Sequence, residues 1–259
     1  MSNKLADKNA LILGASETGS IGATIAEHLL NAGAKVMIAA RRKQQVDKLA
    51  KEIGATGAVC DISNEQQVSD LAAHALDTFK RLDIAINCAG QAVMGDIANT
   101  DAADLRKAVD VHLIGPFFFL KHMAAAIKEN GSIITLSSIT ASLVINNHAA
   151  YVATKAGTDH LVRIAAIEYG HKNIKVNSVS PGFTDNTPMS KPFLKVDGLR
   201  ELFEKEIPLG RLNNAADVAH VVSWLCEDNT YISGQNIQVN GGHSLTRLPS
   251  RNEFAALLK

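Results

Sequence analysis

Short, continuously apolar runs alternate along the chain with longer amphipathic segments. The apolar runs predict seven strands, over residues 10–13, 35–40, 56–60, 83–87, 132–137, 174–179 and 236–239. Strands without alternating polar positions are buried on both faces, which is typical of a parallel sheet covered by helices. Because right-handed crossovers join such strands, the pattern predicts an α/β fold: a single doubly wound domain over residues 1–259, with helices on both faces of the sheet.

The amphipathic segments between these runs predict the helices. They cover residues 43–53, 63–79, 101–128, 149–170 and 214–227, after a first helix that ends near residue 32. The spacing of Ser63 and Gln66 is that of a capping box, so the helix over residues 63–79 should begin there. Gly115 and Pro116 should bend or interrupt the long helix that starts near residue 101.

Two stretches lack a clear period in their hydrophobic residues. Residues 181–212 contain four prolines and are predicted to form a lid or binding loop, with residues 183–212 as the substrate loop. The tail over residues 245–259 ends in a short apolar run, which we expect either to dock on a neighbouring subunit or to stay mobile. An apolar substrate pocket should lie between residues 93–94, residues 143–148 and the substrate loop, although these residues equally suit an oligomer contact.

The composition excludes several classes of protein. Hydrophobic residues make up 46% and charged residues 20% of the chain, as in ordinary globular proteins. The 26 basic and 26 acidic residues balance without a basic stripe, so we expect no binding to nucleic acid or to an anionic membrane. No apolar run approaches the roughly 20 residues of a membrane span, and residues 1–8 lack the apolar core of a signal peptide. We therefore expect a soluble, cytoplasmic protein without a disulfide framework or a metal site.

The first predicted strand ends in a glycine-rich turn, residues 14–22, that opens a helix. Glycines there let backbone amides approach a pyrophosphate at the N-terminus of the helix. This context predicts a dinucleotide-binding site. Its candidate residues in the turn are Gly14, Ser16, Ser20, Ile21 and Gly22.

The end of the second predicted strand indicates which dinucleotide binds. An acidic residue there would bind the ribose 2′-hydroxyl, whereas an arginine would accommodate a 2′-phosphate. The strand ends at Arg41 and Arg42, with no acid beside them, and two guanidiniums can clamp a phosphate dianion. The pair favours NADP(H), with NAD(H) as the second candidate. The alternative is that both arginines simply begin a solvated helix.

Tyr151 and Lys155 stand one turn apart on the predicted helix over residues 149–170. At this spacing both side chains leave the same face of the helix. An adjacent ammonium favours the phenolate and would draw the tyrosine pKa toward the working pH, which suits proton transfer. Taken alone, the pair also fits an ordinary pair on a helix surface.

With these pieces in place, the chain resembles the short-chain dehydrogenase/reductase family over almost its full length, which implies a Rossmann-type fold. The motifs that carry the resemblance follow successive strands in the family's order. They are the glycine turn at residues 14–22, Asp61, residues 87–90, Ser138, Tyr151-x-x-x-Lys155 and Pro181-Gly182. Ser138 lies 13 residues before Tyr151, as in that family.

The resemblance implies a role for each of these residues. Tyr151 would be the general acid in carbonyl reduction and the base in alcohol oxidation. Ser138 would hydrogen-bond the substrate oxygen, and Lys155 would bind the nicotinamide ribose and lower the tyrosine pKa. The cofactor contacts implied outside the glycine turn and the two arginines are Asp61, Ile62, Asn87, Ala89, Gly90, Tyr151, Lys155, Pro181, Gly182 and Thr184. Family members are usually tetramers or dimers, so we expect a homo-oligomer, with a homotetramer first.

The chain departs from the family pattern in two informative places. Its glycine turn is two residues longer than the usual one and is similar to that of the enoyl-reductase branch. That branch, however, separates its Tyr and Lys by six residues, whereas three lie between Tyr151 and Lys155. His112 stands where family members usually carry an Asn that helps to hold a proton-relay water. It either replaces that Asn as a catalytic relay or is an ordinary buried histidine.

The sequence therefore predicts an NADP(H)-dependent oxidoreductase that interconverts a ketone and a secondary alcohol, with 3-oxoacyl thioesters and hydroxysteroids as example substrates. Two alternatives stay open. A catalytically silent dinucleotide-binding sensor or scaffold is suggested by the missing Asn. An enoyl reductase is suggested by the lengthened glycine turn.

Overall fold

The computed structural model describes residues 4–257, which are built on a seven-stranded sheet. The strands lie in the order β3-β2-β1-β4-β5-β6-β7, and each neighbouring pair is parallel. Their bounds are β1 (Asn9–Leu13), β2 (Lys35–Ala40), β3 (Thr56–Val59), β4 (Ile84–Asn87), β5 (Gly131–Leu136), β6 (Ile174–Pro181) and β7 (Asn236–Val239). The predicted doubly wound, seven-stranded parallel sheet is confirmed.

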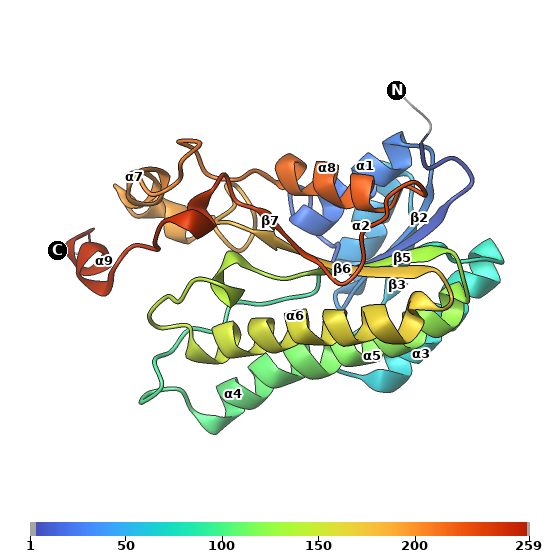
Figure 1. Ribbon diagram of the computed structural model, residues 1–259, viewed down its shortest axis with the longest axis horizontal. Helices are drawn as coiled ribbons and strands as arrows, with labels where there is room; N and C mark the ends of the chain where they lie inside the picture. Colours follow the sequence, from blue (N-terminus) through green and yellow to red (C-terminus); the bar gives the residue numbers. More distant parts are fainter. Residues whose placement is uncertain (1–3, 258–259) are drawn as a thin grey trace.

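Helices cover both faces of the sheet (Figure 1). One face carries α1 (Ile21–Asn31), α2 (Lys43–Ile53) and α8 (Ala215–Leu225), and the other carries α3 (Glu65–Phe79), α5 (Gly115–Ile127) and α6 (Ala149–Gly170). In β1, Ala10 and Ile12 pack with the first group of helices, whereas Leu11 and Leu13 pack with the second. Because successive side chains of a strand point to opposite faces, a run without polar positions serves both layers.

The predicted long fourth helix is interrupted near its glycine–proline pair. α4 (Ala102–Val109) runs into a π-helical turn (Asp110–Ile114), and α5 then begins with Pro116 in its first turn. Proline has no N–H, so the His112 carbonyl four residues earlier loses its helical donor. The Thr158 hydroxyl of α6 donates to that carbonyl instead. The interruption therefore ties α6 to the helix beside it.

The start of α3 differs by one residue from the predicted capping box. Asn64 is the N-cap, and its side-chain oxygen accepts a hydrogen bond from the Gln67 amide at 3.1 Å. The Ser63 hydroxyl donates instead to Asp61 Oδ1 at 2.7 Å. The predicted cap at Ser63 is wrong because the aspartate two residues earlier takes its hydroxyl.

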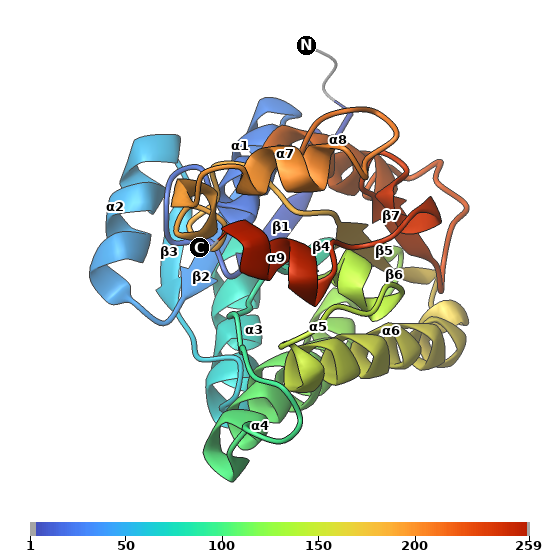
Figure 2. The ribbon, with the colours of Figure 1, turned by 90° about the vertical axis from the view of Figure 1, so that its left-hand side faces the viewer.

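The substrate loop and the tail pack on each other (Figure 2). The loop contains a short helix, α7 (Leu199–Glu204), and the tail ends in α9 (Arg251–Leu257). Phe203 of α7 stacks on another loop aromatic with ring centroids 4.5 Å apart, and it meets Phe254 of α9 at 5.8 Å. The apolar tail thus docks within its own chain, which differs from the expectation of docking on a neighbour or mobility. Residues 258–259 of the tail and residues 1–3 lie outside the described residues.

No helix within residues 4–257 is long and apolar enough to cross a membrane. In the same part of the chain, no three His, Cys, Asp or Glu side chains converge to hold a metal ion. Cys60 and Cys226 are buried free thiols, and burial raises the pKa of each to about 12. These thiols are protonated and unreactive at neutral pH.

Candidate active site

The order of the strands reverses between β1 and β4. In doubly wound sheets, ligands bind at the carboxyl ends of the strands near such a point. The residues predicted from the sequence follow different strands, yet all of these strands end at the same edge. The residues that the fold brings to this edge include Gly14, Arg41, Asp61, Ala89, Ser138 and Gly182, which follow β1, β2, β3, β4, β5 and β6.

The glycine turn presents bare backbone to this edge. Gly14 has a φ of 102°, and a Cβ there would lie 2.4 Å from the Ala89 nitrogen. A Cβ on Gly22 would lie 2.7 Å from the Gly14 oxygen. Ser20 caps α1 by accepting a backbone N–H at 3.2 Å, and Ile21 begins the helix and packs on the core. A side-chain-free turn at the N-terminus of a helix fits the pyrophosphate of a dinucleotide.

The two arginines after β2 differ in their surroundings. Arg42 reaches back to the glycine turn, where its Nη2 donates to Ser16 Oγ at 3.3 Å and pairs with the Glu17 carboxylate. Arg41 is exposed. Glu17 therefore neutralises part of the charge that Arg42 would offer to a phosphate. Glu17 was missed from the sequence, although an acidic residue in a turn near two arginines was a readable signal.

The residues after β3 and β4 were predicted to contact the cofactor. In the structure, most of them pack against or hydrogen-bond to other residues of the protein. Ile62 is 4% exposed and its side chain packs in the core beneath α5, so that side chain is not brought to the site. Asn87 is 2% exposed, and its Oδ1 accepts a hydrogen bond from the Ala89 amide at 3.0 Å. This bond folds the chain after β4 against the glycine turn. Gly90 faces the ring of His112.

The residues predicted as cofactor contacts after β6 form a second backbone turn at the same edge of the sheet. Pro181 ends the strand, and the Gly182 amide donates to the carbonyl of Val239 at 3.0 Å. Thr184 is buried, and its hydroxyl donates to the Gly182 carbonyl at 3.0 Å. Thr184 therefore closes this turn from within.

Tyr151 and Lys155 lie on α6 one turn apart, as the spacing predicted. Lys155 is 5% exposed, and its Nζ donates to the Leu136 carbonyl of β5 at 2.7 Å. The same Nζ lies 5.7 Å from the centroid of the Tyr151 ring. Burial lowers the pKa of Lys155 to about 8, and the negative charge of Asp159 opposes that shift.

The pKa of Tyr151 moves in the direction opposite to the expected one. Burial of the phenol raises the pKa of Tyr151, and a hydrogen bond with Ser138 opposes this only in part. The Lys155 ammonium donates to the Leu136 carbonyl and not to the phenol oxygen, so burial of the phenol sets the direction of the shift. The phenol is therefore protonated at neutral pH, which is the form that a general acid requires.

Ser138 is oriented by a neighbour that was missed from the sequence. Its Oγ accepts hydrogen bonds from the Thr140 amide at 3.2 Å and from the Thr140 hydroxyl at 2.9 Å. With its acceptor positions taken, the Ser138 hydroxyl is left to donate its own proton. The available signal was a hydroxyl two residues after the candidate serine, a spacing at which such side chains bond locally.

His112 lies inside the site and is neutral. Its side chain is 1% exposed, and Nε2 donates to the Gln91 carbonyl at 2.9 Å. Nδ1 is buried and has no hydrogen-bond partner in residues 4–257. The ring meets the Tyr151 ring edge-on at 5.0 Å. Burial and the charge of Lys155 lower the pKa of His112 to about 3, so the ring stays neutral at neutral pH.

The segments predicted to bound the substrate pocket meet beside this site. Gly95 and His148 pair as a parallel bridge, and the Gly95 amide donates to the Asn147 carbonyl at 2.8 Å. Met94 and Val144, near this bridge, are 51% and 85% exposed. Both side chains therefore offer apolar surface to solvent.

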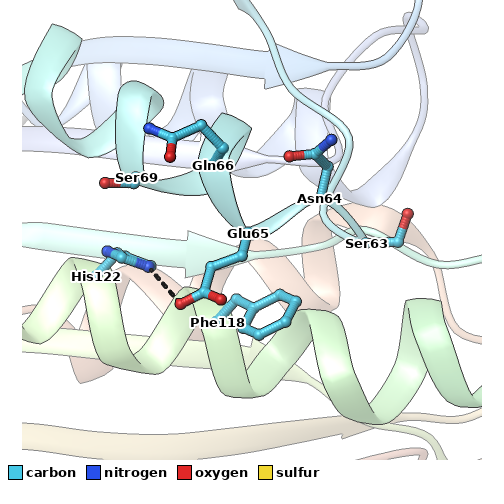
Figure 3. A pocket seen from close by; sticks show the side chains of 7 residues that line it. All are labelled: Ser63, Asn64, Glu65, Gln66, Ser69, Phe118 and His122. Atoms are coloured by element: carbon cyan, nitrogen blue, oxygen red, sulfur yellow. Dashed lines mark hydrogen bonds and ion pairs between the residues drawn. The ribbon is translucent and has the colours of Figure 1, made fainter.

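A separate surface pocket lies between α3 and α5 (Figure 3). Glu65 and His122 point toward each other across it, with Oε1 and Nε2 3.3 Å apart, and Lys121 Nζ donates to the same carboxylate oxygen at 2.7 Å. The residues that line this pocket are Ser63, Asn64, Glu65, Gln66, Ser69, Phe118 and His122. No residue predicted for catalysis or cofactor binding is in that lining, so this pocket is distinct from the candidate active site.

Known proteins match the chain over nearly its whole length. The model of the family described as Enoyl-(Acyl carrier protein) reductase matches residues 14–244. Borneol dehydrogenase, mitochondrial, from Lavandula x intermedia is 34% identical over 247 residues, which cover 93% of this chain and 92% of the relative. Cyclohexanol dehydrogenase from Acinetobacter sp. (strain SE19) is 32% identical over 255 residues, which cover 94% of this chain and 98% of the relative.

A solved structure matches equally well. The short-chain type dehydrogenase/reductase from Mycobacterium ulcerans aligns with a TM-score of 0.92 at 30% identity, over 100% of this chain and 95% of the other. The chain therefore belongs to the short-chain dehydrogenase/reductase family of oxidoreductases, whose cofactor is a nicotinamide dinucleotide.

Proposed function

We propose that the protein is an NADP(H)-dependent oxidoreductase that interconverts a ketone and a secondary alcohol. One arrangement carries this proposal: a protonated Tyr151, a buried Lys155 one turn along α6, and a Ser138 hydroxyl that acts as a donor because Thr140 occupies its acceptor positions. Tyr151 and Ser138 offer two hydrogen-bond donors to one carbonyl oxygen, and the first of them also carries the proton that the product needs.

Each residue then has a defined task. When bound, the nicotinamide supplies or accepts the hydride. The glycine turn would hold its pyrophosphate at the N-terminus of α1, and Lys155 would hold the nicotinamide ribose. Ser138 donates to the substrate carbonyl oxygen and stabilises the negative charge that grows there during reduction. Tyr151 gives its proton to that oxygen, and it takes the proton back when the reaction runs as an oxidation.

His112 is proposed to help return a proton to this centre. Its buried Nδ1 lone pair has no partner among the described residues and can accept a hydrogen bond from a water beside Lys155. A ring whose pKa is about 3 stays neutral across the working range, so His112 would act as a fixed acceptor and not as a titrating base. Replacing His112 with Leu should slow turnover, whereas replacing it with Asn should not.

The preference for NADP(H) rests on Arg41 and Arg42, of which the second already contacts the glycine turn. The proposed substrate is a secondary alcohol on a carbon ring, or the matching ketone. Relatives named for borneol and cyclohexanol, each of which carries such a hydroxyl, support this choice. The exposed apolar side chains of Met94 and Val144 suit a hydrocarbon ring.

The test is a substrate panel assayed with NADPH and NADH in parallel. The panel contains cyclic ketones, a 3-oxoacyl thioester, a steroid ketone and a 2-enoyl thioester. We expect NADPH to be consumed with cyclic ketones, faster than NADH, and the Tyr151→Phe variant to lose that turnover. Binding of NADPH without turnover of any substrate would point instead to a silent sensor or scaffold.

A second candidate is the reduction of a carbon–carbon double bond. The lengthened glycine turn and the match to the family described as Enoyl-(Acyl carrier protein) reductase favour an enoyl reductase. The one-turn spacing of Tyr151 and Lys155 argues against it. Turnover of the enoyl thioester with no turnover of ketones would select this candidate.

We also propose that the protein forms homo-oligomers through the outer faces of α5 and α6. Phe117 of α5 and Ile167 of α6 are 54% and 83% exposed, and large apolar side chains on neighbouring helices favour contact between copies. Light scattering coupled to size-exclusion chromatography would measure the assembly. Replacing both residues with Ser should shift it toward the monomer, and a wild-type monomer would contradict the proposal.

A further inference from the structure

Lys155 is a charged group in a place that disfavours charge. Its side chain is 5% exposed, and its one hydrogen bond to the described residues goes to the Leu136 carbonyl. A carbonyl accepts a hydrogen bond from a neutral amine as well as from an ammonium, so this bond does little to keep the proton on the lysine. The proposed chemistry, however, needs the ammonium, because only its charge favours the phenolate of Tyr151 during alcohol oxidation.

The groups around Lys155 leave one source of negative charge. Burial raises the pKa of the Cys88 thiol to about 12 and keeps it neutral. His112, on the π-helical turn, is neutral as well, and Tyr151 carries its proton. Asp159 lies on α6 one turn beyond Lys155, and of the carboxylates in residues 4–257 it is the one whose charge acts on the lysine.

Asp159 is held in place by the last strand of the sheet. Its Oδ2 accepts a hydrogen bond from Asn236 Nδ2 of β7 at 2.7 Å. Asn236 is itself fixed, because the same Nδ2 lies 2.9 Å from Ser178 Oγ and its Oδ1 accepts from Gln238 Nε2 at 2.6 Å. The carboxylate therefore has little freedom to turn toward solvent.

The other carboxylate oxygen of Asp159 is left without a bond. Oδ1 is buried and has no hydrogen-bond partner in the described part of the chain. A buried anionic oxygen without a partner is costly unless a positive charge lies near it. The i, i+4 spacing puts Lys155 on the same face of α6 as this oxygen.

We propose that Asp159 is the counter-ion that keeps Lys155 charged at neutral pH, and that Asn236 holds it in that position. In this proposal Asp159 acts through Lys155, so it is a positioning residue and not a catalytic one. The inference rests on the proposed function only for the part that Lys155 plays in turnover.

The rival role is purely structural, in which the bond between Asp159 and Asn236 simply joins α6 to β7. Asp159→Asn separates the two, because the amide oxygen still accepts from Asn236 while the charge is gone. In this variant Lys155 loses its proton at a lower pH. The alkaline limb of the kcat profile for alcohol oxidation should therefore move toward acid by about one pH unit.

Two further variants sharpen the test. Glu168→Gln removes the same charge from an exposed position of the same helix and should leave the profile unchanged. Asp159→Glu keeps a carboxylate and should return the limb toward its wild-type position. If Asp159→Asn unfolds at the wild-type temperature and also keeps the wild-type pH profile, the proposal is wrong.

The charge of Lys155 is also measurable without turnover. In protein labelled with ¹³C-lysine, the side-chain methylene signal of Lys155 is assigned by its loss in K155R. Nuclear magnetic resonance should show this signal titrating at a lower pH in Asp159→Asn than in the wild type. A wild-type protein inactive on every ketone would defeat the proposed function alone, whereas an unchanged lysine titration would defeat the counter-ion alone.

Discussion

Charged groups flank the candidate site on two sides and differ in their contact with water. Arg42 and Glu17 pair on the cofactor side, with 54% and 38% of their side chains exposed. Lys155, which has Asp159 one turn away, is 5% exposed on the catalytic side. An exposed pair contributes about 0 to 1 kcal/mol and is screened by salt. A buried charge shifts pKa values by whole units, because water no longer stabilises it. Substitutions on the catalytic side should therefore have the larger effects.

The largest effect should follow the loss of the phenol oxygen on the catalytic side. Tyr151→Phe keeps the ring and its edge-on contact with His112 but removes the proposed acid. We expect kcat for ketone reduction to fall by about 10²- to 10⁴-fold, while NADPH affinity, measured by fluorescence titration, stays nearly unchanged. Full activity of this variant would refute Tyr151 as the proton donor.

The next largest effect concerns stability, because the burial that lowers the pKa of Lys155 also destabilises the folded state. The pKa of Lys155 falls from 10.5 to about 8 on folding, so the unfolded chain binds this proton more tightly. The cost is fully present below pH 8, shrinks as the pH rises, and is gone above pH 10.5. Lys155→Met should therefore raise the free energy of unfolding at pH 7 by up to about 3 kcal/mol, while turnover is lost.

Urea unfolding of wild type and Lys155→Met at pH 7 and at pH 10 measures this prediction. The gap in stability between the two proteins should narrow at the higher pH. Lys172→Met, at an exposed position after the same helix, serves as the control and should show no such gap. A gap of equal size at both pH values would mean that lost packing or lost hydrogen bonding, and not the buried charge, separates the two proteins.

Much of the fold was predictable because its main signal is local. The apolar runs have to serve both faces of the sheet, and that requirement is visible in sequence. The errors lie where polar groups compete for partners, as when Asp61 takes the Ser63 hydroxyl and leaves Asn64 to cap α3. The docking of the tail was hidden for a similar reason, since Phe254 finds its partner Phe203 on a distant segment.

The residues of the site could largely be predicted from the sequence, but their protonation states could be predicted less well. Strand ends put the motifs at one edge, but the partners that tune them come from elsewhere in the chain. Glu17 meets Arg42 across 25 positions, and Asp159 meets Asn236 across 77. The raised pKa of Tyr151 follows from burial, which no local pattern shows. Motifs therefore identified the chemistry, while three-dimensional contacts decided which groups are charged.

A smaller effect on the catalytic side should come from Thr140. Thr140→Val keeps the shape of the side chain and removes the hydroxyl that donates to Ser138 Oγ at 2.9 Å. Ser138 is then free to turn its proton away from the substrate. Loss of about 1 kcal/mol of alignment corresponds to a fall of roughly fivefold in kcat, with little change in KM. Thr140→Ser keeps the hydroxyl and should retain activity; equal losses in both variants would show that packing, not the hydrogen bond, matters.

The smallest effect should appear on the cofactor side, where water screens the charges. Glu17→Gln releases Arg42 from its pair and removes a negative charge that would face a 2′-phosphate. We expect the Kd for NADPH to fall by roughly two- to fivefold at low salt, the Kd for NADH to stay the same, and the difference to vanish at high salt. Glu52→Gln is the matched control, because Glu52 accepts a hydrogen bond from Thr18 of the same turn at 3.3 Å and is not paired with Arg42.

The outcome of that titration bears on the comparison between the exposed and the buried charges. If Glu17→Gln tightens NADPH binding and Glu52→Gln does not, the effect belongs to the pair and not to the general field of the turn. If neither variant changes the preference for NADPH, Arg42 does not bind the 2′-phosphate. The preference would then rest on Arg41 alone. A gain that persisted in high salt would contradict the exposed character of the pair, because only a charge shielded from water escapes screening.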